Sequence, residues 1–198
     1  MIRFIGVILC GLAALSVFAG CAGDPKIRVV RAFNDARDRG DINAAMAMLA
    51  PEPRIWYEHP NGPGMPWTPG QGPWAGWDRF FGSSKRVLGE YQRDGDAVFA
   101  IVEETNGYYR LTERRWSRTM LTWFVTGDHR IRGMLVAGIG ESPSRAAEFR
   151  EWARQIHPSE YAHLFPSDQL DPSGDRPQRM KALLLKWRAA VGLPELND

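Results

Sequence analysis

Cysteine is scarce in this chain and absent from most of it. The only two cysteines of the 198-residue sequence, Cys10 and Cys21, lie near the N-terminus. From residue 22 onward the chain can form no disulfide and no reactive thiolate, so its stability must come from packing. An excess of one charge is missing as well, because the formal net charge is only +2. Proteins that bind nucleic acid usually carry an excess of positive charge, which this sequence lacks, so no nucleic-acid partner is expected.

Several signatures of common site chemistry are also missing. His157 and His163 lie on either side of Pro158 at a spacing that helical metal sites do not use, and no HExxH-type pair occurs. We therefore predict neither a metal nor another cofactor. The glycines between residues 62 and 76 alternate with prolines, unlike a phosphate-binding loop that follows a strand. No G-x-S-x-G sequence marks a serine nucleophile.

The N-terminus carries the one long apolar run of the sequence. Arg3 precedes an apolar stretch from Phe4 to Phe18, and the small residues Ala19 and Gly20 stand directly before Cys21. The run is short for a transmembrane span, and this order of segments resembles a bacterial lipoprotein signal peptide. The resemblance implies that residues 1–20 are removed and that Cys21 becomes the lipidated N-terminus. An ordinary secretory signal and an uncleaved anchor are the alternatives.

That resemblance also implies a location. A lipid on Cys21 would anchor the protein to a membrane of the bacterial cell envelope, on its periplasmic or extracellular face. No second apolar stretch of spanning length follows. The rest of the chain is therefore expected to lie outside the lipid.

Hydrophobic periodicity predicts two helices after the signal segment. Apolar residues recur at helical spacing from Asp24 to Arg39, and Gly40 ends this pattern. Asp41 is a good N-cap for a second helix, which Pro51 stops.

A strand and a long loop are predicted next. Alternation over Arg54 to His59 predicts a strand with Ile55, Tyr57 and His59 on one face. The segment from Pro60 to Trp77 is rich in proline and glycine and is predicted to be a loop. A short third helix is expected between Gly76 and Leu88.

The pattern then changes to that of an antiparallel meander. Asn106 and Gly107 are a strong two-residue hairpin signal between its first two strands. The predicted strands are Ala97–Glu104, Tyr108–Thr112, Trp116–Thr126 and Arg130–Val136. After Glu141 the chain is predicted to form two amphipathic helices, separated by a loop from Pro158 to Asp175.

This order of elements resembles the nuclear transport factor 2-like fold. The segments at residues 29–33, 39–42 and 48–50 (VVRAF, RGDI and MLA) are similar to the N-terminal signature of SnoaL-like and ketosteroid-isomerase-like members. Residues 123–131 (WFVTGDHRI) are similar to their final hairpin. The resemblance covers about residues 25 to 140. It implies an α+β fold, in which a cone-shaped curved antiparallel sheet wraps around the N-terminal helices.

The expected domain organisation follows from these two resemblances. Residues 1–20 would be the signal peptide, residues 21–140 the SnoaL-like domain, and residues 141–198 a C-terminal helical extension. We expect the extension to pack on the outside of the cone or over its mouth. Family members often pair through the outer face of the sheet, so a homodimer is possible.

The resemblance also implies an apolar pocket inside the cone. Trp67 and Trp74 lie in the long loop, which would then act as a lid. The residues expected to line the pocket and bind a ligand are Phe33, Tyr57, Leu121, Trp123 and Met134, together with Trp67 and Trp74.

Catalytic candidates are fewer. The isomerase branch of the family uses a carboxylate base just before a proline, and His59 occupies that place before Pro60. Phe33 and Leu121 stand where oxyanion-stabilising donors are expected, which argues against ketosteroid isomerisation. Glu103 could enter the cone as a partner of His59, or it could lie at the solvated end of the sheet.

Three functions therefore stay open. The leading hypothesis is a lipid-anchored envelope protein that binds a small, mainly apolar molecule in a conical pocket. The first alternative is a cofactor-free acid–base enzyme, such as an isomerase, dehydratase or hydrolase, with His59 as base and Glu103 as partner. The second is a protein-interaction module whose cone is filled by its own side chains. The fold alone does not decide whether the protein is an enzyme.

Overall fold

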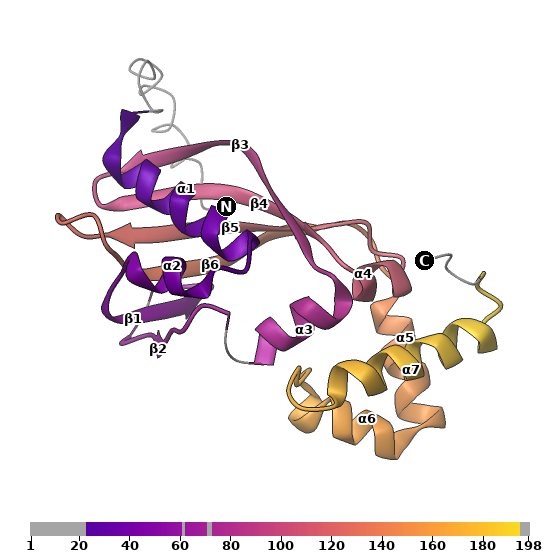
Figure 1. The fold of residues 1–198 in the computed structure, drawn as a ribbon. Helices are drawn as coiled ribbons and strands as arrows, with labels where there is room; N and C mark the ends of the chain where they lie inside the picture. Colours follow the sequence, from indigo (N-terminus) through magenta and orange to yellow (C-terminus); the bar gives the residue numbers. More distant parts are fainter. Residues whose placement is uncertain (1–22, 61, 71–72, 195–198) are drawn as a thin grey trace, which may run out of the picture.

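Two capped helices begin the part of the chain that the computed structural model describes, which is residues 23–60, 62–70 and 73–194 (Figure 1). Helix α1 spans Pro25–Asp38, and the Asp24 side chain accepts hydrogen bonds from the backbone N–H groups of Lys26 and Ile27. Helix α2 spans Ile42–Ala47, and Asp41 accepts a hydrogen bond of 3.0 Å from the N–H of Ala44. Both helices and the Asp41 cap confirm the sequence prediction.

Six strands form a single sheet among the described residues. Its order is β2-β1-β6-β5-β4-β3. Every neighbouring pair is antiparallel except β1 and β6, which are parallel. The strands are β1 (Leu49–Tyr57), β2 (Met65–Pro66), β3 (Ser84–Asp94), β4 (Ala97–Thr105), β5 (Ser117–Val125) and β6 (Ile131–Glu141). Register shifts in β3 and β6 mark irregularities of the kind that bend and twist a sheet.

The inner face of this sheet packs on α1. Val98, Ala100 and Val102 of β4 point to this face, and their register partners on β5 are Trp123, Leu121 and Thr119. Phe33 of α1 and Trp123 of β5 are both fully buried in the same apolar cluster. This confirms the prediction that the two aromatic residues face one interior.

A second apolar cluster lies at one end of the sheet. The remaining helices are α3 (Pro73–Phe81), α4 (Gly107–Leu111), α5 (Ala146–Ile156), α6 (Pro158–Leu164), the 3₁₀ turn η2 (Pro166–Asp168) and α7 (Arg176–Ala190). Figure 1 shows α5, α6 and α7 gathered beyond α4, with α3 beside them. Trp77 and Phe81 of α3 and Leu111 of α4 share this cluster with the C-terminal helices. The extension therefore packs against α3 and α4, at one end of the sheet.

The element order and fold class agree with the expectation from the sequence. Helix, helix, strand, loop, helix and a mostly antiparallel sheet is the order that the nuclear transport factor 2-like resemblance implies. The signal segment and Cys21 lie outside the described residues. Among the residues that are described, no helix is long and apolar enough to cross a membrane.

Some local predictions were wrong. Asn106 and Gly107 do not form a hairpin turn, because Asn106 instead caps α4 by accepting a 2.8 Å hydrogen bond from the N–H of Tyr109. The predicted return strand over 108–112 is therefore helical. The sequence prediction also missed strand β3 and helix α6.

Candidate functional site

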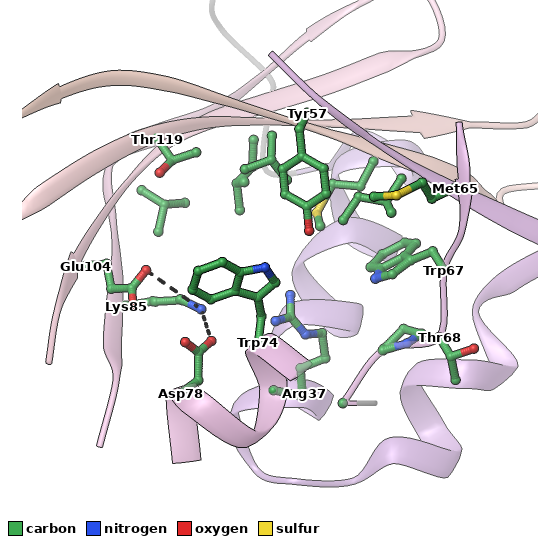
Figure 2. A pocket seen from close by; sticks show the side chains of 18 of the residues that line it. Arg37, Tyr57, Met65, Trp67, Thr68, Trp74, Asp78, Lys85, Glu104 and Thr119 are labelled. Atoms are coloured by element: carbon green, nitrogen blue, oxygen red, sulfur yellow. Dashed lines mark hydrogen bonds and ion pairs between the residues drawn. The ribbon is translucent and has the colours of Figure 1, made fainter. Parts of the chain in front are cut away.

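A cavity of about 440 Å³ lies between the inner face of the sheet and helix α3 (Figure 2). The strands β1, β4, β5 and β6 supply one wall, and the segment from Met65 to Gly70 supplies another. Most of the side chains that line it are apolar. These are Ile55, Met65, Pro66, Trp67, Pro69, Trp74, Ala75, Val102, Leu121, Met134 and Val136.

Five of the seven residues predicted to contact a ligand line this cavity: Tyr57, Trp67, Trp74, Leu121 and Met134. The structure brings them together from β1, β5, β6, the loop and α3. Phe33 lies behind the wall instead, with its ring centroid 5.5 Å from that of Trp67. Trp123 lines a neighbouring cavity. Whether any of these residues binds a ligand stays a prediction.

Regular structure holds the two loop tryptophans in place. Met65 and Pro66 add a short strand to the edge of the sheet beside β1. The backbone N–H of Trp67 donates a 2.9 Å hydrogen bond to the carbonyl oxygen of Pro53. Trp74 belongs to the first turn of α3 and contacts Trp77 edge to face at 6.1 Å between ring centroids. Figure 2 shows Trp67 and Trp74 on opposite sides of the hydroxyl end of Tyr57.

One rim of the cavity is polar and internally paired. Lys85 Nζ lies 2.6 Å from Asp78 Oδ2 and 3.9 Å from Glu104 Oε2. Asp78 also accepts a 3.2 Å hydrogen bond from Ser83, and Glu104 accepts one of 3.1 Å from Asn106. Figure 2 shows this ion-pair cluster at the side of the cavity that faces Thr119. Lys85 therefore engages both carboxylates of the rim.

Arg37 enters the cavity from α1 and lacks such a partner. Its guanidinium lies 5.7 Å from the ring centroid of Phe33, and it makes no hydrogen bond or ion pair with another residue that the structure describes. Burial lowers the pKa of the Arg37 guanidinium, while the charges of Asp38 and Asp78 act to raise it. The sequence analysis did not select Arg37. Its position four residues after Phe33, on the same side of α1, is the signal that could have found it.

A second cavity, of about 290 Å³, adjoins the first. The two share Arg37, Lys85, Val102 and Leu121 as lining residues. Trp123 lines the second cavity, and its indole N–H is buried without a hydrogen-bond partner among the described residues. A buried donor without an acceptor costs on the order of 1–3 kcal/mol. Each such group in a native structure therefore calls for an explanation.

Tyr57 supplies a phenolic hydroxyl to the larger cavity. Burial raises the pKa of the Tyr57 hydroxyl; the nearby Asp78 charge adds to the rise and Lys85 opposes it. The hydroxyl therefore stays protonated at neutral pH and can donate or accept a hydrogen bond.

His59 was predicted on the cavity face and is not there. Strand β1 ends at Tyr57, and Glu58 adopts a positive φ of 64°, which ends the two-residue alternation. His59 consequently lies in the bend after the strand, exposed and outside the lining of either cavity. The expectation that it shares a face with Ile55 and Tyr57 was therefore wrong.

Glu103 was also placed on the wrong face as a partner of His59. It pairs in register with Arg86 and Arg118 on the outer face, while Glu104 is the carboxylate that reaches the cavity. Arg118 donates two hydrogen bonds, of 2.9 and 2.8 Å, and Arg86 donates two more, of 3.0 and 2.7 Å. Hydrogen bonds from Arg118, and to a smaller extent from Arg86, hold the pKa of Glu103 below its ordinary value. Glu103 therefore links β4 to β3 and β5 through these ion pairs.

Comparisons with known proteins give similarity to solved structures alone. No family model matches the chain, and no curated protein matches it. Among solved structures, it is similar to a nuclear transport factor 2-like protein from Burkholderia thailandensis, at 20% identity and a TM-score of 0.43, over 58% of this chain and 90% of that one.

Two further solved structures are similar to this chain. A Sinorhizobium meliloti protein provisionally described as a polyketide cyclase has 16% identity and a TM-score of 0.43, over 55% of this chain and 93% of its own. A Kribbella flavida protein provisionally described as a ketosteroid isomerase has 14% identity and a TM-score of 0.44, over 60% of this chain and 81% of its own. Identities and TM-scores this low leave the activity of the chain open.

Proposed function

We propose that this protein binds a small, mainly apolar molecule in the cavity between the sheet and α3. We further propose that a lipid on Cys21 keeps it at a membrane of the bacterial cell envelope. The observation that carries the binding proposal is the cavity of about 440 Å³ with a largely apolar lining. This volume lies within the range of about 300–1,000 Å³ that is typical of small-molecule sites.

The same cavity favours a binding protein over the two alternatives. A cone filled by its own side chains would leave no such space, and an open cavity therefore argues against a purely structural interaction module. The acid–base enzyme was proposed with His59 and Glu103, and neither residue lines the cavity. No observation on the described residues favours that reaction over simple binding.

Calorimetric titration with methyl 2-naphthoate, an uncharged two-ring probe, tests the proposal. Leu121→Trp should weaken binding at least tenfold, because Leu121 lines both cavities and a larger side chain would fill the space. Leu185→Trp is the matched control, since Leu185 lies exposed on α7. It makes the same substitution away from the cavity and should leave affinity unchanged.

Two results would count against a binding site in this cavity. One is wild-type protein that does not bind the probe. The other is Leu121→Trp protein that binds it as tightly as the wild type does. Circular dichroism of both variants establishes that they are folded. If Leu121→Trp does not fold, Val136→Phe narrows the same cavity from β6.

A further inference from the structure

Two hydrogen-bond donors beside the shared wall of the cavities have no acceptor among the residues that the structure describes. The Arg37 guanidinium lines both cavities, and the indole N–H of Trp123 is buried at the smaller one. Neither group can accept a hydrogen bond. Whatever satisfies them must therefore present acceptor atoms.

The remaining charged groups at the larger cavity do not meet this need. Asp78 and Glu104 are the two carboxylates in its lining, and both are engaged by Lys85. Figure 2 shows Arg37 apart from this cluster, on the other side of Trp74. Among the charged groups that line the larger cavity, Arg37 is therefore the one without a partner on the described part of the chain.

Asp35 and Asp38 of α1 line the smaller cavity together with Arg37, and the Asp38 charge acts on the guanidinium without forming a hydrogen bond or ion pair with it.

The apolar surroundings of Arg37 strengthen its interaction with an anion. Phe33 lies under the guanidinium, and Trp67, Leu121 and Met134 form apolar walls nearby. A charge in apolar surroundings interacts more strongly with an opposite charge than it would in water. The planar guanidinium fork also matches the two oxygens of a carboxylate, which it can bind with two parallel hydrogen bonds.

We propose that the ligand is an apolar molecule that carries a carboxylate group, and that this group binds Arg37 while the apolar body lies against Trp74 and Leu121. This inference rests on the proposed function and narrows its ligand class. A cationic ligand in this cavity would be repelled by the positive charge of Arg37. A hydrocarbon without an acceptor would give Arg37 no hydrogen bond.

Calorimetry with a matched pair of probes tests the inference. The probes are 2-naphthoate and its uncharged methyl ester, each titrated into the wild type, Arg37→Gln and Arg28→Gln. Arg28 lies exposed on α1 and lines neither cavity, so its variant removes the same charge from the same helix. We expect the wild type and Arg28→Gln to bind 2-naphthoate at least tenfold more tightly than the ester.

Arg37→Gln should abolish this preference while changing the affinity for the ester less than threefold. Arg37→Lys keeps the positive charge but loses the guanidinium group, so it should retain part of the preference for the acid. This variant replaces Arg37→Gln if the glutamine variant does not fold. Equal binding of acid and ester by the wild type would overturn the carboxylate inference and leave the cavity function intact. A preference that survives in both Arg37 variants would overturn it as well. Failure of the ester to bind at all would instead count against the proposed function.

Discussion

Single residues on the sheet are sorted to the cavity or to the outer face by alternation along each strand. Glu103 and Glu104 are neighbours in β4, yet Glu103 is tied to two arginines outside while Glu104 lines the cavity. Phe33 and Trp123 are completely buried on the inner side. The chemistry available to a ligand is therefore set by which residue of each neighbouring pair points inward.

The buried aromatic pair makes the first prediction. Phe33→Ala should lower the free energy of unfolding by roughly 3–5 kcal/mol, because it removes a large apolar side chain and leaves a void in the core. Urea denaturation measures this change. Phe80, which is 38% exposed on α3, provides the control, and Phe80→Ala should cost distinctly less. Equal losses in the two variants would mean that α1 does not pack against the sheet as described.

The hydrogen bonds of Arg86 and Arg118 to Glu103 predict that the stability of the protein depends on pH. Because the folded-state pKa of Glu103 lies below its ordinary value of 4.5, the unfolded chain binds this proton first as the pH falls. The contribution to stability is therefore present near neutral pH and is lost as the pH falls through the lowered pKa. Glu103→Gln should be less stable than the wild type near neutral pH, and the gap should close in acid.

Urea denaturation from neutral pH down to about pH 3 follows this gap. Glu90→Gln, at an exposed position of β3, should show only a small difference from the wild type throughout. A gap between wild type and Glu103→Gln that stays constant across this range would contradict the assignment of Glu103 to the two arginines.

At the scale of elements, α3 joins the cavity to the C-terminal helices. Trp74 and Asp78 lie on the side of α3 that lines the cavity. Trp77 and Phe81 lie on the side that packs with α5, α6 and α7. The helices after residue 141 thus support one wall of the candidate site without lining it themselves.

The short strand β2 makes a prediction about local stability. Its two residues pair with the edge of the sheet only through β1, so few contacts hold the segment. Amide hydrogens of residues 65–70 should exchange faster than those of β5, which is paired on both sides. Hydrogen-exchange mass spectrometry compares the two segments. Exchange at residues 65–70 as slow as in β5 would show that this wall is as rigid as the sheet.

The elements that the sequence predicted are those whose signals are local. α1, α2 and β5 follow from hydrophobic spacing, and the cap Asp41 follows from side-chain chemistry. Asn106 was misread because the same residue type suits a hairpin turn and a helix cap, and only contacts distant in sequence decide between them. β3 was missed because most of its side chains are exposed and give no clear alternation.

The candidate site was predictable in part for the same reason. Tyr57, Leu121 and Met134 were found because the family resemblance turns their strand faces inward. His59 was misplaced because the positive φ of Glu58 is not visible in a pattern of hydrophobic residues. Arg37 was missed because its role depends on what α1 faces across the core.

On the scale of the whole molecule, the domain division, the lipid anchor and a homodimer through the outer sheet face all stay predictions. Cys21→Ser should block lipidation, because a hydroxyl is a far poorer acceptor than a thiol. Whole-protein mass spectrometry should then find residues 1–20 still attached in the variant and absent from the lipidated wild type. An unmodified Cys21 in the wild-type protein would contradict the lipoprotein assignment.

The indole N–H signals of the eight tryptophans test the central claim most directly. Trp67 and Trp74 line the larger cavity, whereas Trp152 and Trp187 pack among the C-terminal helices. The measurement is a nitrogen–proton NMR spectrum of the protein titrated with methyl 2-naphthoate. If the apolar molecule binds in the cavity, the Trp67 and Trp74 signals shift and saturate together, while those of Trp152 and Trp187 stay in place. Unmoved Trp67 and Trp74 signals, or shifts confined to Trp152 and Trp187, would contradict binding in this cavity.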